Sequence, residues 1–283
     1  MRAKDRREFL LRLISDSEVS VETLANRLHV TPSTIRRDLA KLTSEGKVTR
    51  TYGGAVISAD HSREPTLYQR AAQCRAEKNA IGRWAAAQVA EGETVILDAG
   101  TTTGRVAHHL RDRLGLTVVT NGVTALLELL GADDVEVVAL GGTLRHISQG
   151  FVGPLTEMML DRLSAERLFL GADGLVADRG ICEFSTVQTR LKELMATRAR
   201  ETYVVADHTK LGHAPFNAWA PLERPWTLVT DDGATAEQLA PFHQLSHTHV
   251  VVVPVVRDIE GIPRVDASRR AAPNDGDAPA VIR

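Results

Sequence analysis

The sequence contains little cysteine and no long apolar run. Cys74 and Cys182 are its two cysteines, which excludes a disulfide framework and a cysteine-based zinc cluster. No stretch approaches the roughly 20 consecutive apolar residues that a membrane-spanning helix requires. The charged residues at the start are not followed by an apolar run of the signal-peptide type. We therefore expect a cytoplasmic protein without membrane contact.

The overall composition is that of an ordinary globular protein. Hydrophobic residues make up 43% and charged residues 25% of the 283 residues, which excludes a disordered chain or a fibrous repeat. The length predicts about two domains of roughly 150 residues. The net charge of −2 conceals an asymmetry: residues 1–57 carry 11 Lys and Arg against 7 Asp and Glu, and the remainder carries 23 against 29. This modest positive excess favours a polyanion as the binding partner of residues 1–57. The charge alone is weak evidence, so the assignment depends on the motifs.

Apolar residues at helical spacing predict three short helices in the first 57 residues. Ser20 and Thr31 are good N-caps for the second and third helices, and Pro32 suits the first turn of the third. Gly46 is typical of a helix C-terminus, and the two extended runs at 47–56 predict a hairpin. The apolar positions of the three helices are Phe9, Leu10, Leu13 and Ile14; Val21, Leu24, Ala25 and Leu28; and Ile35, Leu39 and Leu42. Residues 1–57 therefore read as a winged helix-turn-helix.

The tight turn at 29–31 gives the second and third helices a helix-turn-helix arrangement. Such a motif places the start of its second helix in the major groove. Arg36 and Arg37 suit either phosphate anchoring or bidentate reading of guanine, and Asp38 either orients one of them or forms a surface ion pair. Residues on the hairpin suit backbone or minor-groove contacts. A motif that serves only protein interaction is the alternative. The candidate DNA contacts are Thr31, Ser33, Thr34, Arg36, Arg37, Lys41, Arg50 and Tyr52.

The rest of the chain alternates strand and helix patterns. Residues 58–76 read as a linker, polar from 58 to 66, and the start of a helix that runs from about 67 to 89. Strand-like runs lie at 94–97, 117–119, 136–140, 167–170, 203–206, 227–229 and 249–253, and helical patterns at 105–114, 123–130, 155–163 and 187–200. This alternation predicts an α/β domain over 77–256 with a mostly parallel sheet covered on both faces. Residues 257–283 lack an apolar period and are expected to be a disordered tail.

Polar and glycine-rich turns follow the predicted strands, at the edge where ligands bind in open α/β sheets. The turn D-A-G-T-T-T-G at 98–104 has the glycines, N–H groups and hydroxyls of a phosphate cradle, without the spacing of a P-loop or a dinucleotide site. The other turns offer polar partners for sugar hydroxyls and a lysine that could pair with a phosphate or carboxylate. For each glycine, an ordinary tight turn without a ligand is the alternative. The candidate effector contacts are Asp98, Gly100, Thr101, Thr102, Thr103, Thr120, Asn121, Gly141, Gly142, Asp173, Asp207 and Lys210.

These motifs together resemble the DeoR family of bacterial transcription regulators over residues 5–240. T-I-R-R-D-L at 34–39 and R-T-Y-G-G-A at 50–55 are similar to its DNA-binding domain. D-A-G-T-T-T at 98–103, T-N at 120–121, G-G at 141–142 and D-H-T-K at 207–210 are similar to its effector domain. The resemblance implies that Lys192, which matches a common lysine of the family, faces the same crevice. It also implies a repressor, less often an activator, of sugar or nucleoside catabolism, whose effector domain shares its fold with ribose-5-phosphate isomerase, glucosamine-6-phosphate deaminase and coenzyme A transferases.

We therefore expect a regulator that binds double-stranded operator DNA as a homo-oligomer, dimeric or higher, under the control of a phosphorylated sugar. We expect no cofactor and no metal, because the ten histidines include no helical pair with a carboxylate. One alternative is a sugar-phosphate isomerase or deaminase in which Asp173 and Lys192 act as base and acid, with Glu183 on the loop between them. A second alternative is a dimerisation scaffold without a small ligand.

Overall fold

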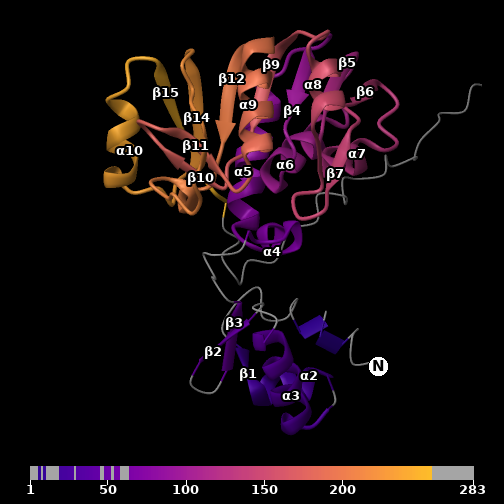
Figure 1. Ribbon diagram of the computed structural model, residues 1–283, viewed down its shortest axis with the longest axis vertical. Helices are drawn as coiled ribbons and strands as arrows, with labels where there is room; N and C mark the ends of the chain where they lie inside the picture. Colours follow the sequence, from indigo (N-terminus) through magenta and orange to yellow (C-terminus); the bar gives the residue numbers. More distant parts are fainter. Residues whose placement is uncertain are drawn as a thin grey trace, which may run out of the picture.

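The computed structural model describes residues 6, 7, 9, 10, 19–28, 30–44, 48–51, 54–57 and 64–256. Figure 1 shows an N-terminal unit of helices with a small sheet, and a larger α/β unit. The fold class predicted from the sequence is confirmed in both parts. The predicted tail at 257–283 and the first part of the linker, 58–63, lie outside the described residues.

The N-terminal unit is the predicted winged helix-turn-helix. Its helices are α2 (Val21–Leu28) and α3 (Pro32–Ser44), and its antiparallel strands, in the order β1-β3-β2, are β1 (Val19–Ser20), β3 (Gly54–Ile57) and β2 (Val48–Thr51). Thr31 caps α3, because the backbone N–H of Thr34 donates to Thr31 Oγ1 at 3.3 Å. Phe9 is 41% exposed, whereas Leu10 is fully buried. The residues that form this core are Leu10, Val21, Leu24, Ala25, Ile35, Leu39 and Leu42. Leu13, Ile14 and Gly46 lie outside the described residues.

The larger unit is built on a sheet of seven parallel strands. Its spatial order is β15-β14-β12-β9-β4-β5-β6. The chain moves outward from β4 to β5 and β6, and then crosses to the other side of β4 with β9, so the strand order reverses between β4 and β9. The strands are β4 (Thr94–Leu97), β5 (Leu116–Thr120), β6 (Val135–Ala139), β9 (Ala165–Leu170), β12 (Ala199–Val205), β14 (Trp226–Asp231) and β15 (Thr248–Val253).

Helices cover both faces of this sheet, because successive residues of a strand point to opposite sides. Val95 and Leu97 pack with helices on one face, whereas Ile96 packs with helices on the other. The helices of the first face are α5 (Arg75–Ala87), α6 (Thr101–Leu110) and α7 (Val123–Leu129). Those of the second face are α8 (Pro154–Leu160), α9 (Thr186–Arg198) and α10 (Ala236–His243).

Two of the predicted helix boundaries are wrong. The helix predicted over 67–89 is divided into α4 (Leu67–Ala72) and α5, because Cys74 between them adopts a left-handed conformation with a φ of 50°. The helix predicted from residue 105 begins at Thr101. The threonine run therefore forms the first turn of α6, which brings the positive end of the helix dipole to the predicted phosphate cradle.

Short antiparallel elements flank the carboxyl ends of the central strands and are not predicted from the sequence. They are the hairpin β7 (Thr143–Arg145) with β8 (Gly150–Val152), and the sheet of β10 (Gly174–Val176), β11 (Gly180–Glu183) and β13 (Ala218–Ala220). A single 3-10 turn, η1 (His208–Lys210), follows β12. Within the described ranges, none of the helices has the length and apolar character to span a membrane.

Candidate functional site

The outward face of α3 is polar and basic. Its apolar residues Ile35 and Leu39 are buried in the core, which leaves the intervening positions to solvent. Near the start of the helix, Thr31 Oγ1 lies 2.8 Å from Ser33 Oγ and 2.9 Å from Thr34 Oγ1, so the three hydroxyls form one cluster. The exposed candidate contacts here are Thr31, Ser33, Arg36, Arg37 and Lys41, and Thr34 is half-buried.

Asp38 is buried and contacts two arginines near the start of the chain. Its Oδ2 accepts a hydrogen bond from Arg6 Nε at 2.5 Å, and its Oδ1 lies 3.7 Å from Arg7 Nη1. The ion pair of Asp38 is therefore buried and not at the surface, and an orienting contact with Arg36 or Arg37 stays a prediction. Among the described residues, its ion-pair partners hold α3 against the start of the chain.

The two strands after α3 form the predicted hairpin. Arg50 lies in β2 opposite Ala55 of β3. Tyr52 lies outside the described residues, between the two strands. Contact between these residues and DNA stays a prediction.

A cavity lies at the carboxyl ends of β4 and β9, where the strand order reverses. This is the position at which open α/β sheets bind ligands. The cavity is narrow, with a volume of about 30 Å³. It brings together turns that follow β4 and β9 with residues from α9 and η1. Of the predicted effector contacts, those that line it are Gly100, Thr101, Thr102, Asp173, Lys192 and Lys210.

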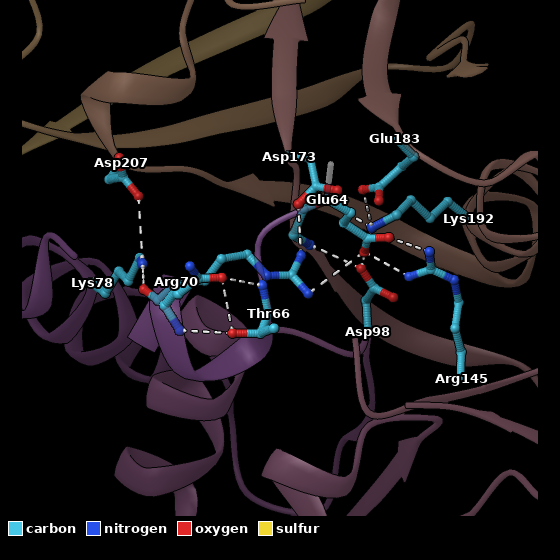
Figure 2. A network of polar contacts seen from close by, with 12 residues as sticks. Glu64, Thr66, Arg70, Lys78, Asp98, Arg145, Asp173, Glu183, Lys192 and Asp207 are labelled. Carbon is cyan, nitrogen blue, oxygen red and sulfur yellow. Dashed lines mark hydrogen bonds and ion pairs between the residues drawn. The ribbon is translucent and has the colours of Figure 1, made fainter. Parts of the chain in front are cut away.

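Lys192 is a buried cation held between two carboxylates (Figure 2). Its Nζ donates to Asp98 Oδ2 and to the carbonyl of Gly171 at 2.9 Å, and lies 3.0 Å from Glu183 Oε1. Burial by itself lowers the pKa of Lys192, but Asp98 and Glu183 outweigh it and hold the pKa above its usual value. Burial raises the pKa of Glu183 to about 8, although Lys192 opposes the change. Asp98 does not itself line the cavity, but it pairs with Lys192, which does.

The first turn of α6 and two lysines form a cationic part of the cavity. The first N–H groups of a helix have no acceptor within the helix, and the dipole favours an anion there. Lys78 Nζ donates to the carbonyls of Arg70 at 2.5 Å and Gln73 at 2.9 Å. Burial lowers the pKa of Lys78 to about 8; the charge of Lys210 adds to this, and Asp207, 3.9 Å away, opposes it. Within the described part of the chain, Lys210 has no ion-pair partner. These groups suit an anionic ligand group.

Among the polar side chains of the lining, those of Arg70, Lys78 and Gln188 are not predicted from the sequence. Arg70 Nη1 donates to Asp173 Oδ1 at 2.6 Å. Several polar atoms at the cavity are buried without a hydrogen-bond partner: Arg70 Nε and Nη2, Asp173 Oδ2 and Gln188 Oε1. Arg70 and Lys78 come from the helices before β4, where no local motif marks them, and the fold alone brings them to the site.

Three predicted contacts make hydrogen bonds within the protein and do not line the cavity. Thr120 Oγ1 donates to the carbonyl of Leu97 at 2.7 Å and accepts from the N–H of Gly122 at 3.0 Å. Asn121 Nδ2 donates to the carbonyl of Phe151 at 3.0 Å, and Thr103 Oγ1 donates to the carbonyl of Gly100 at 3.2 Å. These bonds fix the turns around the cavity.

Gly141, Gly142 and Asp207 also lie outside the lining. Gly142 has a φ of 135°, and a Cβ there would meet Thr156 Oγ1 at 2.3 Å, so the position requires glycine. Thr156 Oγ1 in turn donates to the carbonyl of Gly141 at 2.6 Å. Asp207 caps η1 by accepting from the N–H of Thr209 at 3.2 Å, which places Lys210 at the end of that turn.

Comparison with known proteins gives matches along most of the chain. A DeoR-like helix-turn-helix domain matches residues 6–61, and a DeoR C-terminal sensor domain matches residues 73–232. The transcriptional regulator GlpR of Haloferax volcanii is 37% identical, over 82% of this chain and 91% of its own length. The transcriptional repressor AccR of Agrobacterium fabrum is 34% identical, over 81% and 90%. The glycerol-3-phosphate regulon repressor of Escherichia coli is 34% identical, over 69% and 77%.

The similarity to a solved isomerase structure is weak. Ribose 5-phosphate isomerase A of Methanocaldococcus jannaschii has a TM-score of 0.35 and 16% identity, over 47% of this chain and 52% of that one. A similarity at this level supports no functional assignment.

Proposed function

Because the chain belongs to the DeoR family of transcriptional regulators, we propose that it represses an operon of sugar or nucleoside catabolism under the control of a phosphorylated sugar. The sugar binds in the cavity at the ends of β4 and β9 and changes the affinity of the N-terminal unit for operator DNA. Two of the relatives named above carry the name of repressor, and one of these is a repressor of a glycerol-3-phosphate regulon.

The face of α3 supports direct contact with duplex DNA. In a helix-turn-helix, the start of the second helix enters the major groove, where its first residues reach base edges. The hydroxyl cluster around Thr31 lies at that start, and Arg36 and Arg37 follow within one turn. Each arginine contributes about 1–3 kcal/mol if it forms a good bidentate contact with a base.

The start of α6 supports recognition of a phosphate. Its N–H groups, the hydroxyls of Thr101 and Thr102, and the ammonium groups of Lys78 and Lys210 line the same cavity. A dianionic phosphate satisfies donors of both kinds at once.

The unpartnered acceptors support recognition of a sugar. Asp173 and Gln188 are 6% and 9% exposed, and Asp173 Oδ2 and Gln188 Oε1 are buried without a donor. A buried polar atom without a partner costs about 1–3 kcal/mol, and sugar hydroxyls are donors of the right kind. The proposal rests on one observation: positively charged groups that suit an anion and two unpartnered hydrogen-bond acceptors lie in the same cavity.

Isothermal calorimetry tests this assignment with ribose 5-phosphate, glucosamine 6-phosphate and glycerol 3-phosphate, each beside its unphosphorylated counterpart. We expect at least one phosphorylated compound to bind, and its counterpart to bind roughly 10- to 100-fold more weakly, because it lacks the charged hydrogen bonds. Absence of binding by all of them would favour the scaffold alternative.

The enzyme alternative is not favoured, because the similar proteins named above are regulators and repressors. Turnover of ribose 5-phosphate or glucosamine 6-phosphate by the purified protein would reverse this conclusion.

We further propose that the protein is a homo-oligomer that binds a repeated or palindromic operator, since two-fold proteins match two-fold sites. The cytoplasmic location expected from the sequence stays a prediction.

A further inference from the structure

Residues 64–72, called the entry segment below, lead from the N-terminal unit into the α/β unit and are anchored at their start. The side chain of Glu64 is fully buried. Arg145 of β7 donates to both of its oxygens, from Nη1 to Oε1 at 2.6 Å and from Nη2 to Oε2. The backbone N–H of Leu67 donates to the carbonyl of Ile147 at 3.0 Å. Two contacts with the β7–β8 hairpin region therefore hold the segment.

Arg70 connects this anchor to the cavity (Figure 2). Its Nη1 donates to Asp173 Oδ1 at 2.6 Å, and its Nη2 lies 3.9 Å from Glu64 Oε1. The same guanidinium lines the cavity, and its Nε and Nη2 are buried without an acceptor. A buried guanidinium with two unused donors is ready to bond an oxygen of a ligand.

We propose that a ligand in the cavity bonds Arg70 and thereby holds the entry segment in its docked position on the α/β unit. The nature of the ligand rests on the function proposed above. The bond to Arg70 exists only while the segment is docked, so the ligand stabilises the docked state by its differential affinity. By reciprocity, the factor by which the ligand favours the docked segment is also the factor by which release of the segment weakens ligand binding.

Glu64, at the start of the segment, and its partner Arg145 act as positioning residues, since neither of them lines the cavity. The N-terminal unit precedes Glu64 in the chain, so the docked anchor fixes the point from which that unit is held. Occupancy of the cavity is thereby coupled to the placement of the DNA-binding unit through Arg70 and Glu64.

Limited trypsin digestion of the full-length chain tests the anchor without a ligand. Trypsin cuts after Arg63, and the fragment that begins at Glu64 is quantified by mass spectrometry. We expect Arg145→Gln to accelerate this cut several-fold, because the buried carboxylate of Glu64 loses its counter-ion. Arg145→Lys, which keeps the charge but not the two-pronged contact, should give a smaller increase. Arg190→Gln is the control, because Arg190 is 74% exposed and pairs with Glu157 on the surface. Equal rates in all four proteins, each folded by circular dichroism, would overturn the anchor.

The same digestion with ribose 5-phosphate, glucosamine 6-phosphate and glycerol 3-phosphate tests the coupling. We expect a compound that binds by calorimetry to slow the cut after Arg63, and Arg145→Gln to weaken its binding. In Arg70→Gln the compound should bind more weakly and no longer protect this bond. A compound that binds the wild type but leaves the cut unchanged would overturn the coupling while the proposed function stands. If none of the compounds binds, the proposed function is contradicted, and so is the proposed effect of the ligand on the entry segment. The digestion of Arg145→Gln would still test whether Arg145 anchors Glu64.

Discussion

Asp38 of α3 accepts a hydrogen bond from Arg6, 2.5 Å away, across 32 positions of sequence. The helix that carries the candidate DNA contacts is thus fixed to the start of the chain by a largely buried ion pair, whose side chains are 6% and 15% exposed. The orientation of the candidate recognition surface therefore depends on a buried residue.

Replacement of Asp38 by alanine should destabilise the N-terminal unit. We expect Asp38→Ala to lower its free energy of unfolding by about 1.5–3 kcal/mol, the range for a hydrogen bond to a charged group. The measurement is urea unfolding followed by circular dichroism. Asp161→Ala is the control, because Asp161 is 50% exposed in its pair with Arg198 and should change stability little. Equal effects of the two substitutions would contradict this role.

Removal of the two exposed arginines of α3 should weaken operator binding and leave the effector site intact. We expect Arg36→Ala and Arg37→Ala each to lose about 1–3 kcal/mol of DNA affinity if they read bases. If an arginine instead contacts phosphate, the slope of log affinity against log salt should fall by about one. Fluorescence anisotropy at several salt concentrations separates the two cases. A double variant that binds operator like the wild type, or that also loses effector affinity, would show that the two roles are not divided as proposed.

A carboxylate in the first turn of α6 should have the opposite effect. Thr102 is 8% exposed and lines the cavity, so Thr102→Glu places a negative charge where we propose a phosphate. We expect calorimetry to show loss of sugar-phosphate binding while operator binding persists. Thr197→Glu, at an exposed position of α9, is the matched control. Unchanged binding of the sugar phosphate by Thr102→Glu would place the anion elsewhere.

Effector affinity should fall as pH rises above about 8. The pKa of Lys78 is lowered to about 8 by burial, so below that pH the side chain is charged and above it the unliganded protein must first take up a proton to bind the phosphate. Affinity should be level between pH 7 and 8 and then weaken by up to tenfold per pH unit. Lys78→Arg, which stays charged, should remove this dependence between pH 7.5 and 9.5. A wild-type affinity that is constant over that range would exclude Lys78 as a phosphate contact.

The central sheet could be predicted from the sequence because its strands are buried on both faces. Val95, Ile96 and Leu97 are all fully buried, although they belong to opposite clusters, so the strand reads as a continuous apolar run. The start of α6 was harder to predict. Threonine is a weak helix former, and it suits both a loop turn and the first turn of a helix. The sequence alone therefore does not show whether Thr101 belongs to the loop or to the helix.

The candidate site could be predicted only in part, because several of its residues come from segments that are far apart in the sequence. Asp98 and Lys192 are 94 positions apart and meet only in the fold. Arg70 lies in a helical pattern that any solvent-facing arginine would satisfy, and Asp173, its partner, is 103 positions away. By contrast, Thr120 and Gly142 lie at or after strand ends as ligand contacts do, yet bonds and packing within the protein account for both.

The most direct test is a titration of the full-length protein against an operator selected from a random duplex pool, with and without a sugar phosphate that calorimetry shows to bind. We predict that the bound compound changes operator affinity by about 5- to 150-fold, the usual range of coupling between two sites, and that Thr102→Glu removes this change. Equal operator affinity with and without the bound compound would contradict the account.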